Sequence, residues 1–338
     1  MNCYHFIKLS IVFIILGSNS LLSVQAQKQQ TLKVLYETKF EIERHIHSLA
    51  FSPDGKVLAV GEENVHLYDM SGDGPKEITV FTTRMGGICS MMFSPDGKKL
   101  AFGGGDQSVR VWDVAEKKEL FQTKDHKACV RSVGFAPDGT MLASGSDDRT
   151  TILWDMGEDG KLTERSVIKA EDNMSGEVKS ILFTQKGKAL VTACSNGTFR
   201  LYSIGAMGVK QTGGFKAKNG YGEVCIRSSP NGQLLAVTDR KSIQILNANG
   251  NALGVLDGHK ENVADIGFSP DGKLLASVGR DGSIHVWSIS ARAIKLTKER
   301  PGKFTSVAWA PGTEASTEMT LAAALEDGAV WVMKLGYK

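Results

Sequence analysis

Residues 257–288 read DGHKENVADIGFSPDGKLLASVGRDGSIHVWS, and this stretch decides the fold. It holds three short apolar runs, with Pro270-Asp271-Gly272 after the first and Asp281-Gly282 after the second. Alternation of apolar and polar residues over short runs is typical of half-buried strands, and Asp-Gly pairs are typical of tight antiparallel turns. The stretch therefore predicts a three-stranded meander. Such a unit cannot bury both of its faces alone, so it should recur along the chain.

The turn at Pro270 does recur. Its strong copies are FSPDG at 51–55, FSPDG at 93–97 and FAPDG at 135–139, and its weaker copies start at Phe183, Ser228 and Trp309. The third residues of these seven turns lie at 53, 95, 137, 185, 230, 270 and 311, which gives spacings of 40–48 residues. This is close to the period of a four-stranded propeller blade, about 40–45 residues.

Each repeat also ends its third strand on an aromatic or apolar residue in register: Tyr68, Trp112, Trp154, Tyr202, Leu246, Trp287 and Met333. Trp112-Asp113 and Trp154-Asp155 are Trp-Asp dipeptides, and Gly258-His259 opens the quoted stretch. With these motifs the chain resembles the WD-repeat family over essentially everything after residue 30. The resemblance implies an all-β fold, in which residues 27–338 form a single seven-bladed β-propeller.

The two ends of the repeat array predict how the ring closes. The last third strand, residues 329–335, is followed by three residues, too few for an outer fourth strand. The alternating segment 31–40 belongs to no repeat. We expect this segment to pair with the last blade, as the resemblance also implies, because closure protects sheet edges that would otherwise pair with other chains.

Residues 1–26 read as a secretory signal peptide. Lys8 precedes an apolar run at 9–16, and Val24-Gln25-Ala26 fits the small-residue cleavage rule. The run is far shorter than the roughly 20 residues of a membrane-spanning helix, although an uncleaved anchor is the alternative. Cys3 lies before the run, the wrong place for a lipid-attachment cysteine. We therefore expect an exported protein of the periplasm or an equivalent compartment, without stable membrane insertion after cleavage.

The charge of the chain is nearly balanced. The 40 basic and 37 acidic residues give a net charge of +3, and cleavage after Ala26 would remove Lys8. The basic residues are scattered, without a run of five or more. Nucleic-acid binding proteins usually carry a basic patch, so we expect no nucleic-acid partner.

Two repeats carry a complete polar set that the WD-repeat resemblance identifies as a buried hydrogen-bond network. The sets are His126, Ser144, Asp148 and Trp154 in the third repeat, and His259, Ser277, Asp281 and Trp287 in the sixth. A His-Ser-Asp set also looks like a hydrolase triad. The structural interpretation is favoured because a buried imidazole needs partners on both nitrogens, and because a catalytic site normally occurs once.

The cysteines and histidines do not predict a cofactor or metal site. Cys89, Cys129, Cys194 and Cys225 lie one per repeat, so most pairs should exceed the ~7 Å Cα reach of a disulfide, and buried free thiols are favoured. His45 and His47 would lie on one face of a strand without a third ligand. The loop at 69–74 starts like a calcium loop but carries Val80 where the bidentate Glu should be, so a hairpin turn is favoured.

No reactive set remains, so the first hypothesis is a non-catalytic scaffold, a complex subunit whose loops bind other exported proteins. The connections before the first strands carry long polar and aromatic side chains, which are common at interfaces: Arg84, Lys127, Tyr221, Lys260 and Lys303. The chain is also similar in size, export signal and lack of haem motifs to the propeller subunits of hydrazine synthase. That similarity would imply haem-bearing catalytic subunits as partners.

Two alternatives stay open. The first is an enzyme or solute-binding propeller that uses its central channel, as propeller lactonases do, for which the first strands offer Arg131, Lys179, Glu223 and Asp265. The second is a TolB-type translocation propeller, against which the Trp-Asp and Gly-His dipeptides and the seven repeats argue. The fifth repeat is the most divergent, and its strand register before Pro230 is expected to be shifted by one residue.

Overall fold

The structure is a computed structural model that describes residues 31–42, 44–72, 74–83, 86–169, 176–206, 208–217, 224–312 and 318–337. The expected signal peptide, residues 1–26, lies outside the described residues. The repeat array, Thr31–Lys338, is one compact unit. Among the described residues, no helix has the length and apolar character that a membrane span requires.

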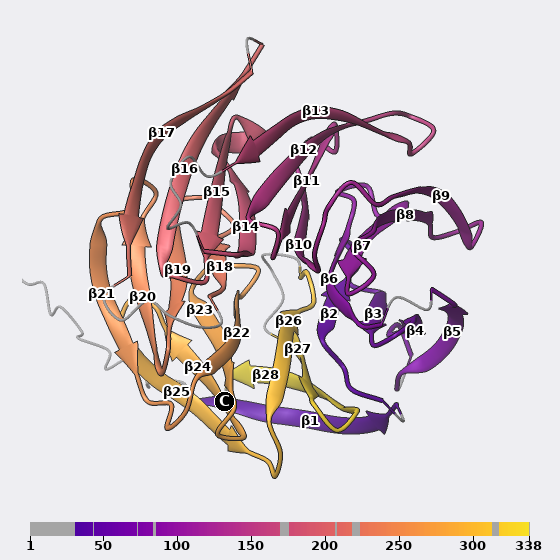
Figure 1. The fold of residues 1–338 in the computed structure, drawn as a ribbon. Helices are drawn as coiled ribbons and strands as arrows, with labels where there is room; N and C mark the ends of the chain where they lie inside the picture. Colours follow the sequence, from indigo (N-terminus) through magenta and orange to yellow (C-terminus); the bar gives the residue numbers. More distant parts are fainter. Residues whose placement is uncertain are drawn as a thin grey trace, which may run out of the picture. The chain divides into compact units, whose positions relative to one another are not determined.

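Seven four-stranded antiparallel sheets form the blades of a β-propeller, as predicted (Figure 1). From inner to outer strand, blade 1 is β2 (Ser48–Phe51), β3 (Val57–Gly61), β4 (Val65–Asp69) and β5 (Lys76–Phe81), blade 2 is β6 (Ile88–Phe93), β7 (Lys99–Gly104), β8 (Val109–Asp113) and β9 (Lys118–Thr123), and blade 3 is β10 (Val130–Phe135), β11 (Met141–Ser146), β12 (Thr150–Met156) and β13 (Leu162–Lys169). Blade 4 is β14 (Val178–Thr184), β15 (Ala189–Cys194), β16 (Thr198–Gly205) and β17 (Gly208–Lys216), and blade 5 is β18 (Ile226–Ser228), β19 (Leu234–Asp239), β20 (Ser242–Asn247) and β21 (Ala252–Asp257). Blade 6 is β22 (Val263–Phe268), β23 (Leu274–Gly279), β24 (Ser283–Ser288) and β25 (Ala293–Glu299), and blade 7 is β26 (Phe304–Trp309), β27 (Glu318–Leu325), β28 (Ala329–Tyr337) and β1 (Leu32–Glu41).

The Ser-Pro-Asp-Gly pattern forms the turn between the inner and second strands. In blade 6, Asp271 Oδ1 accepts hydrogen bonds from the Ser269 hydroxyl (2.6 Å) and the Lys273 amide (3.0 Å). Ser269 Oγ accepts the amide of Leu274 (2.9 Å), and Gly272 has a φ of 68°, which favours glycine. We call this end of the propeller the turn end, and the opposite end, where the inner strands begin, the loop end.

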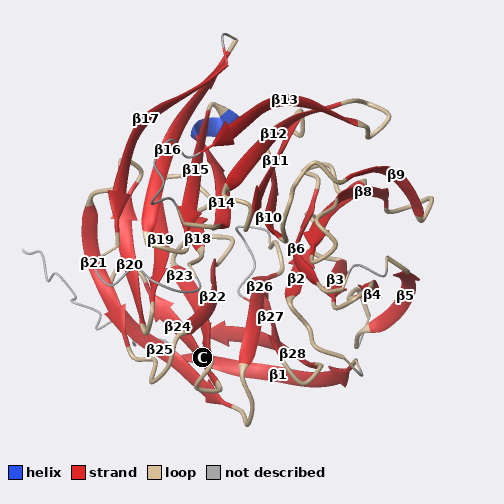
Figure 2. Cartoon of the chain, in the orientation of Figure 1, coloured by secondary structure: helices blue, strands red, loops and turns tan. Residues whose placement is uncertain are grey.

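Figure 2 shows that the regular structure of the described chain is almost entirely β-strand, joined by loops and turns. The exception is a short 3-10 helix, η1 (Gln185–Gly187), which takes the place of the turn in the divergent fourth repeat. Apolar cores lie between neighbouring blades. One of them joins Ala236 and Ile245 of blade 5 to Ile266, Leu275 and Trp287 of blade 6. Each blade thus buries its faces against its two neighbours, as a repeat protein does.

The ring closes as predicted, because β1 pairs antiparallel with β28 and completes blade 7. Leu32 pairs with Tyr337 and is only 2% exposed. It belongs to an apolar cluster that also contains Val286 of blade 6 and Leu335 of blade 7. The first strand of the array is therefore part of the last blade and of the core beside it.

The expected register shift in the fifth repeat is wrong. Ile226 lies opposite Val237, and Ile266 lies opposite Ser277, so both inner strands hold the same register relative to Pro230 and Pro270. The regular strand β18 spans only Ile226–Ser228, and the shortness of this strand, with Ser228 in place of Phe, accounts for the irregular sequence pattern.

Replacing Leu32 with Ala should lower the free energy of unfolding by about 2–5 kcal/mol, because the substitution leaves a cavity in the core beside the closing strand. Lys33 is exposed on the same strand, so Lys33→Ala is the matched control and should stay within about 0.5 kcal/mol of the parent. Urea denaturation followed by circular dichroism measures both. Equal stabilities of the two variants would show that this strand does not close the ring.

Candidate functional site

The first polar set assembles in blade 3 as a continuous chain of hydrogen bonds. Trp154 Nε1 donates to Ser144 Oγ (3.0 Å), and Ser144 Oγ lies 2.8 Å from His126 Nε2. His126 Nδ1 lies 2.9 Å from Asp148 Oδ2, and the same carboxylate oxygen accepts the backbone amide of Lys127 (2.8 Å). The chain of contacts thus runs from the third strand to the loop before the inner strand.

The second set forms the same chain in blade 6. Trp287 Nε1 donates to Ser277 Oγ (2.8 Å), which lies 2.7 Å from His259 Nε2. His259 Nδ1 lies 3.3 Å from both carboxylate oxygens of Asp281, whose Oδ2 accepts the amide of Lys260 (2.6 Å). In both blades the carboxylate fixes the backbone of the lysine that follows the histidine.

His285 is a member of the blade 6 network that the sequence does not reveal. It lies two residues before Trp287, at a position that the repeat pattern makes an ordinary polar strand position, but its side chain is buried. Its ring centroid lies 4.4 Å from that of His259, and the Ser283 hydroxyl lies within 3.3 Å of a ring nitrogen of each. Thr297 Oγ1 lies 2.9 Å from the other nitrogen of His285.

Burial controls the charge of this network. Desolvation, together with the nearby His285, lowers the pKa of His259 to about 4. Desolvation also lowers the pKa of His285. Burial alone would raise the pKa of Asp281, but hydrogen bonds from the Ser283 hydroxyl and the Lys260 amide lower it to about 2. At neutral pH the network therefore holds neutral imidazoles and a carboxylate whose oxygens already accept hydrogen bonds.

The partner-facing residues named from the sequence separate into two groups. Lys127, Lys260 and Lys303 lie at the loop end of blades 3, 6 and 7 and are exposed. The carbonyl of Lys303 accepts the amide of Glu326. Arg84 and Tyr221 lie outside the described residues. We call the three described lysines the loop-end lysines.

The inner strands surround a central channel that holds a cavity of about 1050 Å³. The polar residues proposed for a channel site occur there mainly in ion pairs. Arg131 and Lys179 both contact Asp147, each at 2.7 Å, and Arg227 contacts Asp265 at 3.0 Å. Glu223 lies outside the described residues. The channel lining thus carries charged side chains. Their ion pairs join blade 3 to blade 4 and blade 5 to blade 6.

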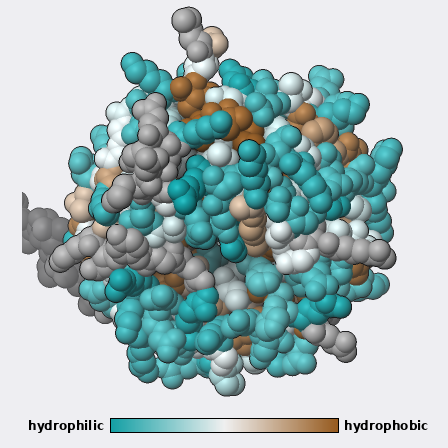
Figure 3. All heavy atoms as spheres, in the orientation of Figure 1, coloured by the Kyte–Doolittle hydropathy of each residue, from teal (hydrophilic) through white to brown (hydrophobic). Residues whose placement is uncertain are grey.

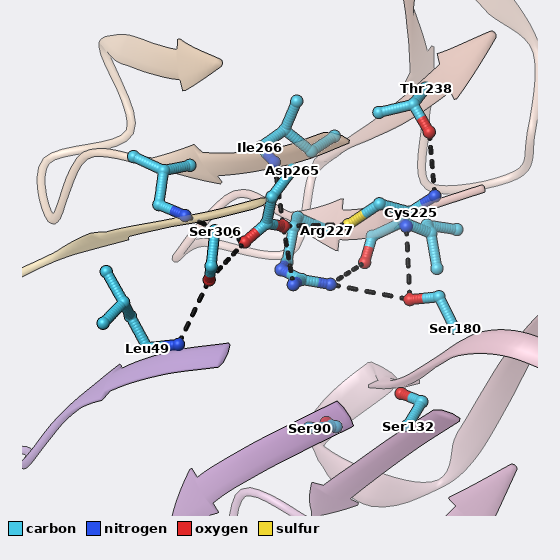
Figure 4. A network of polar contacts seen from close by, with 12 residues as sticks. Leu49, Ser90, Ser132, Ser180, Cys225, Arg227, Thr238, Asp265, Ile266 and Ser306 are labelled. Carbon is cyan, nitrogen blue, oxygen red and sulfur yellow. Dashed lines mark hydrogen bonds and ion pairs between the residues drawn. The ribbon is translucent and has the colours of Figure 1, made fainter. Parts of the chain in front are cut away.

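Along the wall of the channel, a belt of polar side chains joins one blade to the next (Figure 4). Its members lie five residues before the third position of each turn: Ser48, Ser90, Ser132, Ser180, Cys225, Asp265 and Ser306. At five junctions between blades, the belt residue of one blade accepts a hydrogen bond from a backbone amide of the next blade. The donor is the residue directly after the next blade's own belt residue. The five donors are the amides of Val133, Ile181, Ile226, Val307 and Leu49. We call these seven residues the inner belt.

The sequence contains a signal for the inner belt, although the turns and aromatic residues of the repeat are more conspicuous. A small polar residue recurs at one fixed distance before the turn. The belt departs from serine at Cys225 and Asp265, where Cys225 Sγ contacts Asp265 Oδ1 at 3.3 Å and Arg227 binds the same oxygen. Asp265 Oδ2 accepts both the hydroxyl of Ser306 (3.0 Å) and the amide of Val307 (3.1 Å).

All four described cysteines are free thiols, but the expectation that they are buried is wrong for two of them. Cys194 and Cys225 are buried. Cys89 and Cys129 are partly exposed, and their sulfur atoms lie 3.2 Å apart although they belong to neighbouring blades. Inner strands converge on the propeller axis, so residues one repeat apart approach each other there more closely than elsewhere in the blades.

Among the described residues, no group of three or more His, Cys, Asp or Glu side chains could hold a metal ion. His45 and His47 precede β2 instead of lying on a strand, which corrects the expected geometry. His45 Nδ1 lies 2.7 Å from the carbonyl of Glu326. In the loop at 69–74, Asp69 Oδ1 accepts the Ser71 amide (2.9 Å) and hydroxyl (2.6 Å), while Asp73 lies outside the described residues.

Two family models match the chain. The model described as the IFT122 first beta-propeller matches residues 87–315, and the model described as WD domain, G-beta repeat matches residues 36–69. The first match spans more than half of the chain.

Three curated proteins show the extent of the similarity. The chain is 29% identical over 148 residues to a periodic tryptophan protein 2 homolog of Dictyostelium discoideum, covering 40% of this chain and 15% of that protein. It is 27% identical over 130 residues to a subunit of chromatin assembly factor 1 from Mus musculus, covering 37% and 23%. It is 28% identical over 155 residues to an uncharacterized WD repeat-containing protein of Synechocystis, covering 44% of each. The matches thus span less than half of these relatives.

His259→Ala and Asp281→Ala should each lower the free energy of unfolding by about 1–3 kcal/mol, because each leaves a buried polar partner unsatisfied. The double variant should lose clearly less than the sum of the two, since both substitutions break one network. A double-mutant cycle measured by urea denaturation checks this. A simple sum would contradict the network.

Acid should destabilise the protein through His259. Its pKa is about 4 in the fold and about 6.5 when unfolded, so the unfolded state binds the proton more readily. The contribution of neutral His259 to the free energy of unfolding is fully present above pH 6.5. It falls by up to about 3 kcal/mol as the pH decreases toward 4. His259→Asn should flatten this part of the curve of unfolding free energy against pH. An unchanged slope in the variant would contradict the assignment.

Proposed function

Because the chain belongs to the WD-repeat β-propeller family, we propose that it acts as a protein-interaction scaffold, a subunit that binds other proteins at its loop end. Propellers of this family generally bind protein partners. One relative named above is itself called a subunit, of chromatin assembly factor 1.

One observation carries the proposal: the polar sets fix the backbone of the loops on which exposed lysines lie. Asp148 and Asp281 accept the amides of Lys127 and Lys260, so both loops are tied to buried strands. A loop held in one conformation loses less entropy when a partner binds, which raises affinity without new contacts. The His-Ser-Asp groups that resemble a triad are the groups that hold these loops.

Exposed apolar side chains are localised on the propeller surface. Figure 3 shows a mostly hydrophilic face with small groups of apolar side chains. Large exposed apolar residues of the described chain lie mainly on outer strands, such as Ile78 on β5 and Val255 on β21. Aliphatic residues of this kind could extend an interface that the charged loop end begins, because stable interfaces combine an apolar centre with a polar rim.

We further propose that the partners are other exported proteins. This part of the proposal rests on the signal-peptide pattern of residues 1–26, which lies outside the described residues. The specific candidate is the hydrazine synthase assembly, in which haem-bearing subunits perform the chemistry and the propeller would hold them together. Its support is the similarity of size, export pattern and motif content described above.

Replacing the loop-end lysines together, as Lys127→Ala, Lys260→Ala and Lys303→Ala in one variant, should lower the yield of co-purifying protein by about tenfold, or ~1.4 kcal/mol of binding free energy. The measurement is quantitative mass spectrometry of proteins captured from the source cell by tagged wild type and variant. Melting temperatures should be equal, because all three side chains are exposed.

The matched control replaces Lys56, Lys98 and Lys273, which are exposed at the turn end, with Ala. This control removes the same charge from the opposite end and should keep its partners. If both variants lost their partners equally, binding would rest on general charge attraction and not on the loop end. If the wild type captured no stoichiometric companion, the scaffold function would be contradicted.

A further inference from the structure

We propose that Cys89 and Cys129 form a redox-active dithiol at the loop end of the central channel, which exchanges with small-molecule disulfides. This site is separate from the loop-end lysines, and its chemistry does not depend on the scaffold function.

The geometry brings the two sulfur atoms almost to bonding distance. Cys89 lies at a β-bulge of β6, where the pairing with β7 shifts between Ile88 and Ser90, and Cys129 lies directly before β10. The sulfur atoms are 3.2 Å apart, against about 2 Å in a disulfide. Bulges redirect a side chain, and the backbone of Cys129 is held by the Asp147 amide at its carbonyl, so a rotation of the two side chains with a short shift at the bulge closes the bond.

A cation lies beside one of the two sulfurs. Arg131 Nη1 lies 3.7 Å from Cys89 Sγ, while Arg131 Nε is bound to Asp147 Oδ2 at 2.7 Å. Asp147 in turn binds Lys179, so the guanidinium is held in place by an ion-pair chain. A positive charge next to a partly exposed thiol is the environment of reactive cysteines.

The two thiols consequently differ in acidity. The contact with Cys129 and the charge of Arg131 together overcome burial and lower the pKa of Cys89 to about 7. The contact with Cys89 and burial raise the pKa of Cys129. Because Arg131 contacts the Cys89 sulfur and Cys89 lines the cavity, Cys89 is the attacking thiolate and Cys129 the resolving thiol. Cys89 and Cys225 both line the channel cavity, but Cys89 is partly exposed and Cys225 is buried, so small disulfides have access to Cys89.

The thiol–disulfide exchange needs no reagent other than the disulfide RSSR and water. The Cys89 thiolate attacks one sulfur of a disulfide RSSR, whose S–S bond breaks and whose first thiolate leaves and takes a proton from water. Cys129 then loses its proton to solvent and attacks Cys89 Sγ, which releases the second thiolate. Two protein thiols are oxidised to one disulfide, and RSSR is reduced to two RSH.

The other two described cysteines are internal controls. Cys225 is buried, its sulfur contacts Asp265, and burial raises its pKa to about 12. Cys194 is also buried, and its sulfur accepts a contact from Arg200 (3.3 Å). Burial keeps solutes away from both sulfurs, so both should remain thiols under conditions that oxidise the pair.

Equilibration of the full chain with glutathione and its disulfide, followed by alkylation and peptide mass spectrometry, tests the proposal. We expect one cross-link, between Cys89 and Cys129, with Cys194 and Cys225 unchanged. Cys129→Ser should accumulate glutathione on Cys89, whereas Cys89→Ser should leave Cys129 unmodified. Failure of the wild type to form the cross-link at any glutathione ratio would overturn the proposal.

The rate of Cys89 alkylation against pH gives a readout that does not need a folded cysteine variant. In wild type the rate should rise around pH 7. Arg131→Gln should shift the rise to higher pH, and Arg131→Lys should restore most of it. A Cys89 rate that equals that of Cys225 would overturn the assignment. So would a thiol pair that reacts only after a chelator has removed a bound metal, since the site would then be a metal site.

Discussion

The inner belt is the constraint on which the rest of the structure depends. In this propeller, amides of the innermost strands face the preceding blade, away from water, and buried amides need partners. Ser90, Ser132 and Ser180 supply those partners from the preceding blade, and Ser306 does so across the closing junction to Leu49. At five of the seven junctions one blade therefore supplies the acceptor for an amide of the next, and the bond from Ser306 to Leu49 forms only when the ring closes.

The chemistry of the channel depends on the positions at which the inner belt carries a residue other than serine, and at which the channel lining carries a thiol or a charged side chain. At blades 5 and 6 the belt uses Cys225 and Asp265, and the extra charge of Asp265 is balanced by Arg227 and by hydrogen bonds from blade 7. At blades 2 and 3 the lining carries Cys89 and Arg131 at equivalent strand positions. The buried polar groups hold the blades together, while the partly exposed Cys89 lines the channel cavity.

The repeat pattern predicts the blades and the closing strand because turns, periodicity and aromatic residues are local signals. The pairing of β1 with β28 can be predicted as well, since one segment lacks a blade and one blade lacks a strand. The proximity of Cys89 to Cys129 cannot, because spacing along the chain says nothing of convergence on the axis. His285 escapes prediction for a similar reason, because the sequence does not show that its ring lies 4.4 Å from that of His259.

The central claim is that the His-Asp pairs hold the loop end in one conformation for a partner. Hydrogen exchange of the backbone amides of Lys127 and Lys260 tests this most directly, because Asp148 and Asp281 accept these two amides. We predict exchange as slow as that of inner-strand amides in the wild type, and exchange at the rate of an open loop in Asp148→Ala and Asp281→Ala, each at its own amide. Rapid exchange of both amides in the wild type would contradict the claim.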